Sequence, residues 1–228
     1  MTTRLLCLPY AGAGAGVYRP WYITESPLLN ACPIQVPGRE EEFTEPFYAD
    51  MAEASAATAD RFRSTAGTEP YLVFGHSFGA VLAYEAVRHL ADTGGPLPQR
   101  LVVSGSVSPR HRMTGRLSED DERAVEEVRE LVGRDVEAFH YPELRALLLP
   151  VMRADVALLA DYAPGAVRAL PVPITAFRGT DDARVPVPQW EDWASYTSST
   201  FDSAQFAGGH MYLTECWPVL WKTIEGLL

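Results

Sequence analysis

The chain has 228 residues, of which 47% are hydrophobic and 11% aromatic, so it can bury the core of one large domain. A formal net charge of −11 argues against nucleic acid as a partner, because phosphate binding needs a basic face, and it disfavours attraction to anionic membranes. Its three cysteines, Cys7, Cys32 and Cys216, are odd in number and widely spaced, so we expect a reducing, cytoplasmic setting, no disulfide framework and no metal site.

Short apolar runs alternate with helical patterns along the chain. Strands are predicted at residues 5–8, 33–36, 71–74, 101–104 and 174–177, with a weaker one at 203–206. Helices are predicted at residues 50–66, 80–90 and 217–228. The first run is too short for a signal peptide or a membrane span. Buried strands separated by helices are typical of an α/β fold with a mostly parallel central sheet and helices on both faces.

One long segment, at about residues 106–170, breaks this alternation. It contains no convincing strand, but two sets of its apolar residues have helical spacing: Val125, Val128, Leu131 and Val132, then Leu144, Leu147, Leu148, Val151 and Met152. Pro150 interrupts the second set, and we expect it to begin a new helix that carries Leu158, Leu159 and Tyr162. We therefore predict a single domain over residues 1–228 with a helical lid insertion, the alternative being a packing subdomain without a gating role.

A nucleophile motif lies between the predicted strand at 71–74 and the helix at 80–90. Residues 75–79 read Gly-His-Ser-Phe-Gly and fit G-x-S-x-G. A sharp strand-to-helix turn would expose the Ser77 hydroxyl, and the flanking glycines would let neighbouring chains approach closely. This context predicts the α/β-hydrolase fold with Ser77 as the nucleophile, rather than a serine that caps a helix.

A serine nucleophile needs a base and a carboxylate that orients the base. In this fold the chain order is serine, acid, histidine. Of the five histidines, only His210 follows the last predicted strands, in a loop ahead of a helix, and we take it as the base. The acid is expected after the strand at 174–177, where Asp181 and Asp182 compete.

Hydrolysis also needs two N–H groups to stabilise the negative charge that develops on oxygen. The backbone of Phe78, directly after the nucleophile, supplies one. The second is expected from the loop at residues 9–14, with Ala11 as the candidate and Tyr10 as the neighbouring alternative. This glycine-rich loop lacks the spacing of a phosphate or dinucleotide loop.

Several segments together resemble the type II thioesterases that accompany polyketide synthases and nonribosomal peptide synthetases. The segments are PYAGAGAGVY near the start, QVPGREEEFTEP at 35–46, VFGHSFGAVLAYE at 73–85, LPVMRAD at 149–155, FRGTDDARV at 177–185 and GGHMYL at 208–213. They span nearly the whole chain, and the PGRE and RAD elements are more specific than the nucleophile motif alone. The family pattern around the acid selects Asp182 and makes Asp181 a turn or cap residue.

The resemblance implies a discrete, monomeric enzyme that hydrolyses acyl groups from the phosphopantetheine arm of acyl or peptidyl carrier proteins, which clears aberrant or stalled chains. No cofactor is implied, since phosphopantetheine belongs to the substrate. Arg110, His111, Arg112 and Arg116 are the candidate basic surface for an acidic carrier, the alternative being a solvated loop. A general esterase, a non-catalytic scaffold and an integrated terminal domain remain open; the intact set of Ser77, Asp182 and His210 argues against the scaffold.

Overall fold

The computed structural model describes residues 2–112 and 114–228. Within these residues the chain forms a six-stranded sheet of order β2-β1-β3-β4-β5-β6, in which every neighbouring pair is parallel. The strands are β1 (Thr3–Leu8), β2 (Leu29–Pro33), β3 (Tyr71–His76), β4 (Arg100–Ser104), β5 (Ile174–Gly179) and β6 (Phe201–Phe206). The predicted α/β fold with a parallel sheet is therefore confirmed.

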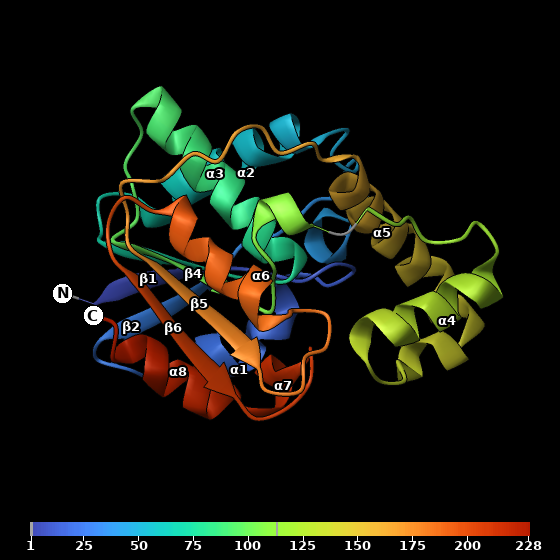
Figure 1. Cartoon of the computed structure of the whole chain (residues 1–228). Helices are drawn as coiled ribbons and strands as arrows, with labels where there is room; N and C mark the ends of the chain where they lie inside the picture. The colour runs from blue at the N-terminus through green and yellow to red at the C-terminus, as the bar shows by residue number, and fades with distance from the viewer. Residues whose placement is uncertain (1, 113) are drawn as a thin grey trace.

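Helices cover both faces of the sheet (Figure 1). One face carries α2 (Met51–Ala66) and α3 (Phe78–Thr93), and the other carries α1 (Arg19–Tyr22), α7 (Tyr212–Glu215) and α8 (Trp217–Glu225). Short helices α6 (Val187–Glu191) and η5 (Asp192–Tyr196) precede β6, and η1 (Ala15–Tyr18) and η2 (Glu40–Glu42) follow β1 and β2. All residues of β3 and β5 are buried, which explains why these strands read as continuous apolar runs rather than alternating ones.

The second strand lies earlier in the chain than predicted. Residues 33–36 were expected to form it, but pairing with β1 ends where Pro33 meets Cys7. Ile34 still donates its N–H to the Cys7 carbonyl at 2.9 Å, and its side chain and that of Val36 are buried in the core. The apolar run therefore marks core-facing chain beyond the strand end, where Pro33 cannot donate to a ladder.

The segment between β4 and β5 is helical, as predicted. It contains η3 (Pro109–His111), α4 (Asp121–Val132), η4 (Glu137–His140) and α5 (Pro142–Asp161). Figure 1 shows α4 standing beyond the sheet rather than on either face of it. This part has a small core of its own, formed by Leu117, Ala124, Val125, Val128, Phe139, Leu149 and Val156.

The expectation that Pro150 begins a new helix is wrong. Helix α5 runs without a break from Pro142 to Asp161, with Pro150 in its interior. The predicted apolar face is also partly wrong, because Leu144 and Leu147 are 43% and 47% exposed, whereas Leu149 is buried. An interior proline costs about 3 kcal/mol by removing one helical hydrogen bond. Burial of the side chains on either side of it offsets this cost.

Candidate active site

Ser77 occupies a strained turn between β3 and α3. Its φ of 52° and ψ of −115° lie in a region that side chains rarely adopt, at a cost of about 1–3 kcal/mol. The Ser77 N–H donates to the Ser104 carbonyl at 2.8 Å, which ties the turn to β4. A Cβ on Gly75 would lie 2.1 Å from the Gly79 oxygen, and one on Gly79 would lie 2.5 Å from the Pro9 oxygen. Both positions of the motif therefore require glycine.

The Ser77 side chain is directed to His210 rather than to the start of α3. It makes no capping hydrogen bond, and its Oγ lies 3.1 Å from His210 Nε2. His210 Nδ1 in turn lies 2.8 Å from Asp182 Oδ2. The three residues predicted as nucleophile, base and acid are thus connected in series, from a turn after β3, a loop after β5 and a loop after β6.

Asp182, and not its neighbour, is the carboxylate that contacts the histidine. It is 1% exposed, and its second oxygen, Oδ1, accepts the Arg184 N–H at 3.0 Å. Asp181 is exposed and donates its backbone N–H to the Gly208 carbonyl at 2.9 Å, next to the His210 loop. With both oxygens engaged, the Asp182 carboxylate has one orientation toward His210.

His76 packs behind the site, and the sequence assigned it no role. Its ring centre lies 5.3 Å from that of His210. Its Nδ1 lies 2.9 Å from Ser104 Oγ, which lies 2.5 Å from the Tyr212 hydroxyl. Burial, and then the nearby His210, hold the pKa of His76 well below its ordinary value. His76 is therefore a neutral residue packed against His210. Ser104 lies in no motif, and Tyr212 lies in the family segment GGHMYL, which by itself gives it no role.

A cavity of about 60 Å³ opens beside Ser77 and His210. The rest of its lining is mostly apolar, with Arg184 as a charged member. The lining residues besides Ser77 and His210 are Tyr10, Ala11, Gly115, Leu131, Val132, Met152, Val156, Leu159, Arg184 and Met211. Both candidates for the second N–H donor, Ala11 and Tyr10, line it, whereas the Gly12 N–H is already bonded to Asp155 at 2.8 Å. Phe78 is the first residue of α3, where N–H groups have no partner within the helix.

Arg184 is a cationic side chain in the lining of this cavity. Burial lowers its pKa, while Asp182 and Glu130 act in the opposite direction. Its Nη1 lies 3.5 Å from the Glu130 carbonyl oxygen in α4, so the loop after β5 contacts the helical insertion here.

The basic segment proposed for carrier docking is largely paired within the fold. Arg110 Nε lies 2.9 Å from Asp192, His111 lies 3.5 Å from the same carboxylate, and Arg116 pairs with Asp161. Arg112 lies over the ring of Tyr162 at 5.7 Å. These carboxylates weaken the positive field that the segment presents to an acidic partner.

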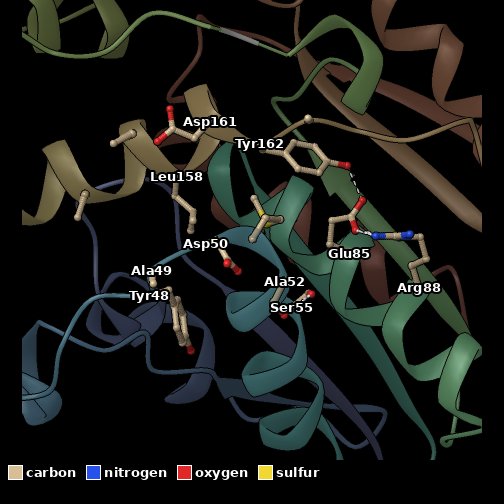
Figure 2. A pocket seen from close by; sticks show the side chains of 14 residues that line it. Tyr48, Ala49, Asp50, Ala52, Ser55, Glu85, Arg88, Leu158, Asp161 and Tyr162 are labelled. Atoms are coloured by element: carbon tan, nitrogen blue, oxygen red, sulfur yellow. Dashed lines mark hydrogen bonds and ion pairs between the residues drawn. The ribbon is translucent and has the colours of Figure 1, made fainter.

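A larger cavity, of about 410 Å³, lies elsewhere (Figure 2). It is formed by the start of α2, the middle of α3 and the end of α5. Figure 2 shows Glu85 between Arg88 and Tyr162, both of which donate hydrogen bonds to it. Glu85 is eight residues along α3 from Ser77, or about 12 Å. Neither Ser77 nor His210 lines this cavity.

Over residues 2–112 and 114–228, no group of three or more His, Cys, Asp and Glu side chains is arranged to hold a metal ion. Over the same residues, none of the helices combines the length and the apolar character needed to cross a membrane.

The parallel sheet, the turn at Ser77 and the helical insertion define an enzyme of the α/β-hydrolase type. The chain matches the model of the thioesterase domain family over residues 3–227. It is 32% identical to thioesterase PikA5 of Streptomyces venezuelae over 221 residues, which is 94% of this chain and 76% of that protein.

Two solved structures have the same fold over nearly their whole length. The type II thioesterase BorB from the borrelidin biosynthetic cluster is 33% identical, with a TM-score of 0.87 over 98% of this chain and 91% of that one. ClbQ from the colibactin NRPS/PKS pathway is 26% identical, with a TM-score of 0.91 over 99% and 96%. The chain belongs to the thioesterase domain family, and it is a hydrolase that acts on thioesters.

Proposed function

We propose that this chain is a discrete type II thioesterase that removes acyl groups from the phosphopantetheine arm of acyl or peptidyl carrier proteins. The observation that carries the proposal is the series of contacts from Asp182 through His210 to Ser77, at the edge of an apolar cavity. The family membership and the relatives named as type II thioesterases support the choice of a thioester substrate.

In this mechanism the Ser77 oxygen attacks the thioester carbonyl while His210 Nε2 takes the hydroxyl proton. The carbonyl oxygen becomes an oxyanion, which the N–H groups of Ala11 and Phe78 stabilise. Collapse of this intermediate breaks the carbon–sulfur bond, and the proton on His210 passes to the departing sulfur. Asp182 holds the imidazole with Nδ1–H toward itself and stabilises the imidazolium. Water then adds to the acyl-Ser77 ester by the same steps, which releases the acid and restores Ser77.

The cavity favours short acyl groups. A single water needs about 10–15 Å³ of such volume, so 60 Å³ holds about four to six groups of that size. This matches an acyl chain of about two to four carbons, the kind left on a carrier by mis-priming or stalling. We propose that clearing such chains is the role of the enzyme, and that it acts as a cytoplasmic monomer without a bound cofactor.

We propose further that the chain is one domain whose insertion, at about residues 106–170, acts as the lid of this cavity. Leu131 and Val132 at the end of α4 line the cavity, and so do Met152, Val156 and Leu159 of α5. Because α4 stands beyond the sheet and packs on α5 through the small core of the insertion, it is the part of the insertion that is placed to open.

The test compares a carrier-bound acyl thioester with a matched free oxygen ester. Intact-protein mass spectrometry of acetyl-, butyryl- and octanoyl-loaded carrier should show hydrolysis of the two short chains at a higher kcat/KM than that of the free ester. Turnover of the free ester with the loaded carrier left intact would refute the carrier assignment and favour a general esterase.

A further inference from the structure

Two sequence motifs that the proposed mechanism does not use meet at the loop of residues 10–16. One is the turn Pro37-Gly38-Arg39-Glu40 after β2, and the other is Asp155 in α5. Although 116 residues separate Arg39 from Asp155, the two form a buried ion pair in which each side chain is 5% exposed. The pair therefore connects the β2 side of the sheet to the helical insertion.

The Arg39–Asp155 pair also holds the loop itself. Arg39 Nη1 and Nη2 donate to the two Asp155 oxygens at 2.6 and 2.8 Å. Asp155 Oδ2 accepts the Gly12 N–H at 2.8 Å, and Arg39 Nη1 donates to the Ala13 carbonyl at 3.1 Å. The two residues that follow Ala11 are thus each hydrogen-bonded through their backbone to one member of the ion pair, Gly12 to Asp155 and Ala13 to Arg39.

A second contact with α5 fixes the loop from the same side. Met152 is three residues before Asp155, so both project from one face of the helix. A Cβ at Gly12 would lie 2.6 Å from Met152 Cε, and Gly12 has a φ of +77°. The loop therefore rests directly on α5 at the residue after Ala11, and only glycine fits there.

The far end of the loop is held by Glu40. Its carboxylate oxygens accept the Gly16 N–H at 3.1 and 3.2 Å, at the start of η1. Glu40 has a φ of +47°, a strained value for a residue with a side chain. A Cβ at Gly14 would lie 2.2 Å from the Glu40 Cδ. Arg39 and Glu40, which are adjacent in one turn, thus bind the loop at Ala13 and at Gly16.

We infer that Arg39 and Asp155 are positioning residues that hold the Ala11 N–H at the oxyanion site. The inference rests on the proposed function, in which Ala11 donates to the oxyanion. The hydrogen bonds to Asp155 and Arg39 hold the backbone directly after Ala11, so losing the Asp155 acceptor loosens the peptide next to the donor. A misplacement of about 1 Å in an active site costs about 10²-fold in rate. Outright loss of one oxyanion donor costs about 10²–10³-fold.

The variants separate positioning from stability. Asp155→Leu keeps the approximate size of the side chain but removes both oxygens that accept hydrogen bonds from Gly12 and Arg39. The double variant Arg39→Met with Asp155→Leu removes both buried charges and restores an apolar interior, which is often neutral or stabilising. Arg61→Gln is the matched control, because Arg61 pairs with Glu42 through two bonds of 2.6 Å, beside the same turn, without touching residues 10–16.

Each variant is measured in three ways, and kcat is expressed per active site, counted by titration with a fluorophosphonate. The first is kcat and KM for acetyl-N-acetylcysteamine thioester. The second is the inhibition constant of butylboronic acid, whose boron accepts the Ser77 oxygen and becomes a tetrahedral anion at the oxyanion site. The third is the melting temperature. Ser77→Ala serves as the inactive reference.

We expect both Asp155 variants to lower kcat per site by about tenfold or more, with KM within about threefold of wild type. Boronate affinity should fall by a similar factor, and Arg61→Gln should match wild type in both. If the variants melt at lower temperature or give fewer sites, but each site keeps wild-type kcat and boronate affinity, the pair is structural only and the inference is wrong. If wild type itself lacks Ser77-dependent thioester hydrolysis, the proposed function fails, whatever the Asp155 variants do, and the inference falls with it.

Discussion

Replacing Asp182 with asparagine should disable His210 while leaving the shape of the site unchanged. In the wild type both Asp182 oxygens accept hydrogen bonds, one from His210 Nδ1 and one from the Arg184 N–H. Asparagine offers one acceptor and one donor. If its oxygen faces Arg184, its NH₂ faces Nδ1, which must then be unprotonated. If the amide is reversed, NH₂ meets the Arg184 N–H and two donors collide.

We expect the arrangement in which the asparagine NH₂ faces Nδ1, and this arrangement determines how far kcat falls. With Nδ1 accepting, the neutral imidazole carries its proton on Nε2, which lies 3.1 Å from the Ser77 oxygen. Nε2 then cannot accept the hydroxyl proton. Loss of the correct tautomer in a serine triad costs about 10⁴-fold in kcat. Because asparagine is nearly isosteric with aspartate, stability should change by less than about 2 kcal/mol.

The assay is steady-state hydrolysis of a short acyl thioester by Asp182→Asn, with Asp181→Asn as the matched control. The control removes one negative charge at the next residue, which is exposed and whose carboxylate accepts a hydrogen bond from the Thr180 hydroxyl at 3.3 Å. Asp181→Asn should stay within about threefold of wild type. A kcat for Asp182→Asn within tenfold of wild type, or a larger loss for Asp181→Asn, would refute the assignment of the acid.

Three further changes test the surroundings of the site. Gly79→Ala should destabilise the fold by about 1–3 kcal/mol in urea unfolding, since its Cβ would meet the backbone oxygens of Leu8 and Pro9 at 2.6 and 2.5 Å, whereas Gly165→Ala meets nothing within 4 Å and should be near neutral. Because the pKa of His76 is lowered in the folded state, the unfolded state binds one more proton at low pH, and the free energy of unfolding falls as the pH drops below about 6.5. Over this range wild type should lose up to about 1.4 kcal/mol per pH unit more than His76→Gln. Parallel profiles of stability against pH for the two proteins would contradict this. Leu159→Ala enlarges the cavity and should raise the kcat/KM ratio of octanoyl to acetyl thioester by about tenfold; an unchanged ratio would show that Leu159 does not limit chain length.

The nucleophile turn was readable from sequence because its requirements are local. The close approaches at Gly75 and Gly79 and the strained φ at Ser77 all arise within five residues. The order in which serine, acid and histidine follow one another along the chain then limits the predicted partners of Ser77 to His210 and one of two aspartates. Choosing Asp182 over Asp181 needed either the family pattern or the structure, since adjacent residues share every local signal.

Features that depend on contacts between residues far apart in the chain could not be predicted from the sequence. Pro150 is a helix-start signal in isolation, and only the burial of its neighbours keeps it inside α5. The apolar run at 33–36 predicts a strand because burial and strand pairing give the same pattern in a sequence, whereas pairing with β1 ends at Pro33. The Arg39–Asp155 pair joins motifs 116 residues apart, so the sequence could mark both as family features without showing that they touch.

The most direct test of the account is to trap the acyl group on Ser77. Wild-type enzyme is mixed with acetyl-loaded carrier protein, quenched in acid on the millisecond timescale and examined by intact-protein and peptide mass spectrometry. We expect a transient adduct with the mass of the acyl group on the peptide that contains Ser77, loss of the acyl group from the carrier, and neither event with Ser77→Ala. Release of the acyl group by Ser77→Ala at the wild-type rate, or an adduct on another residue, would contradict it.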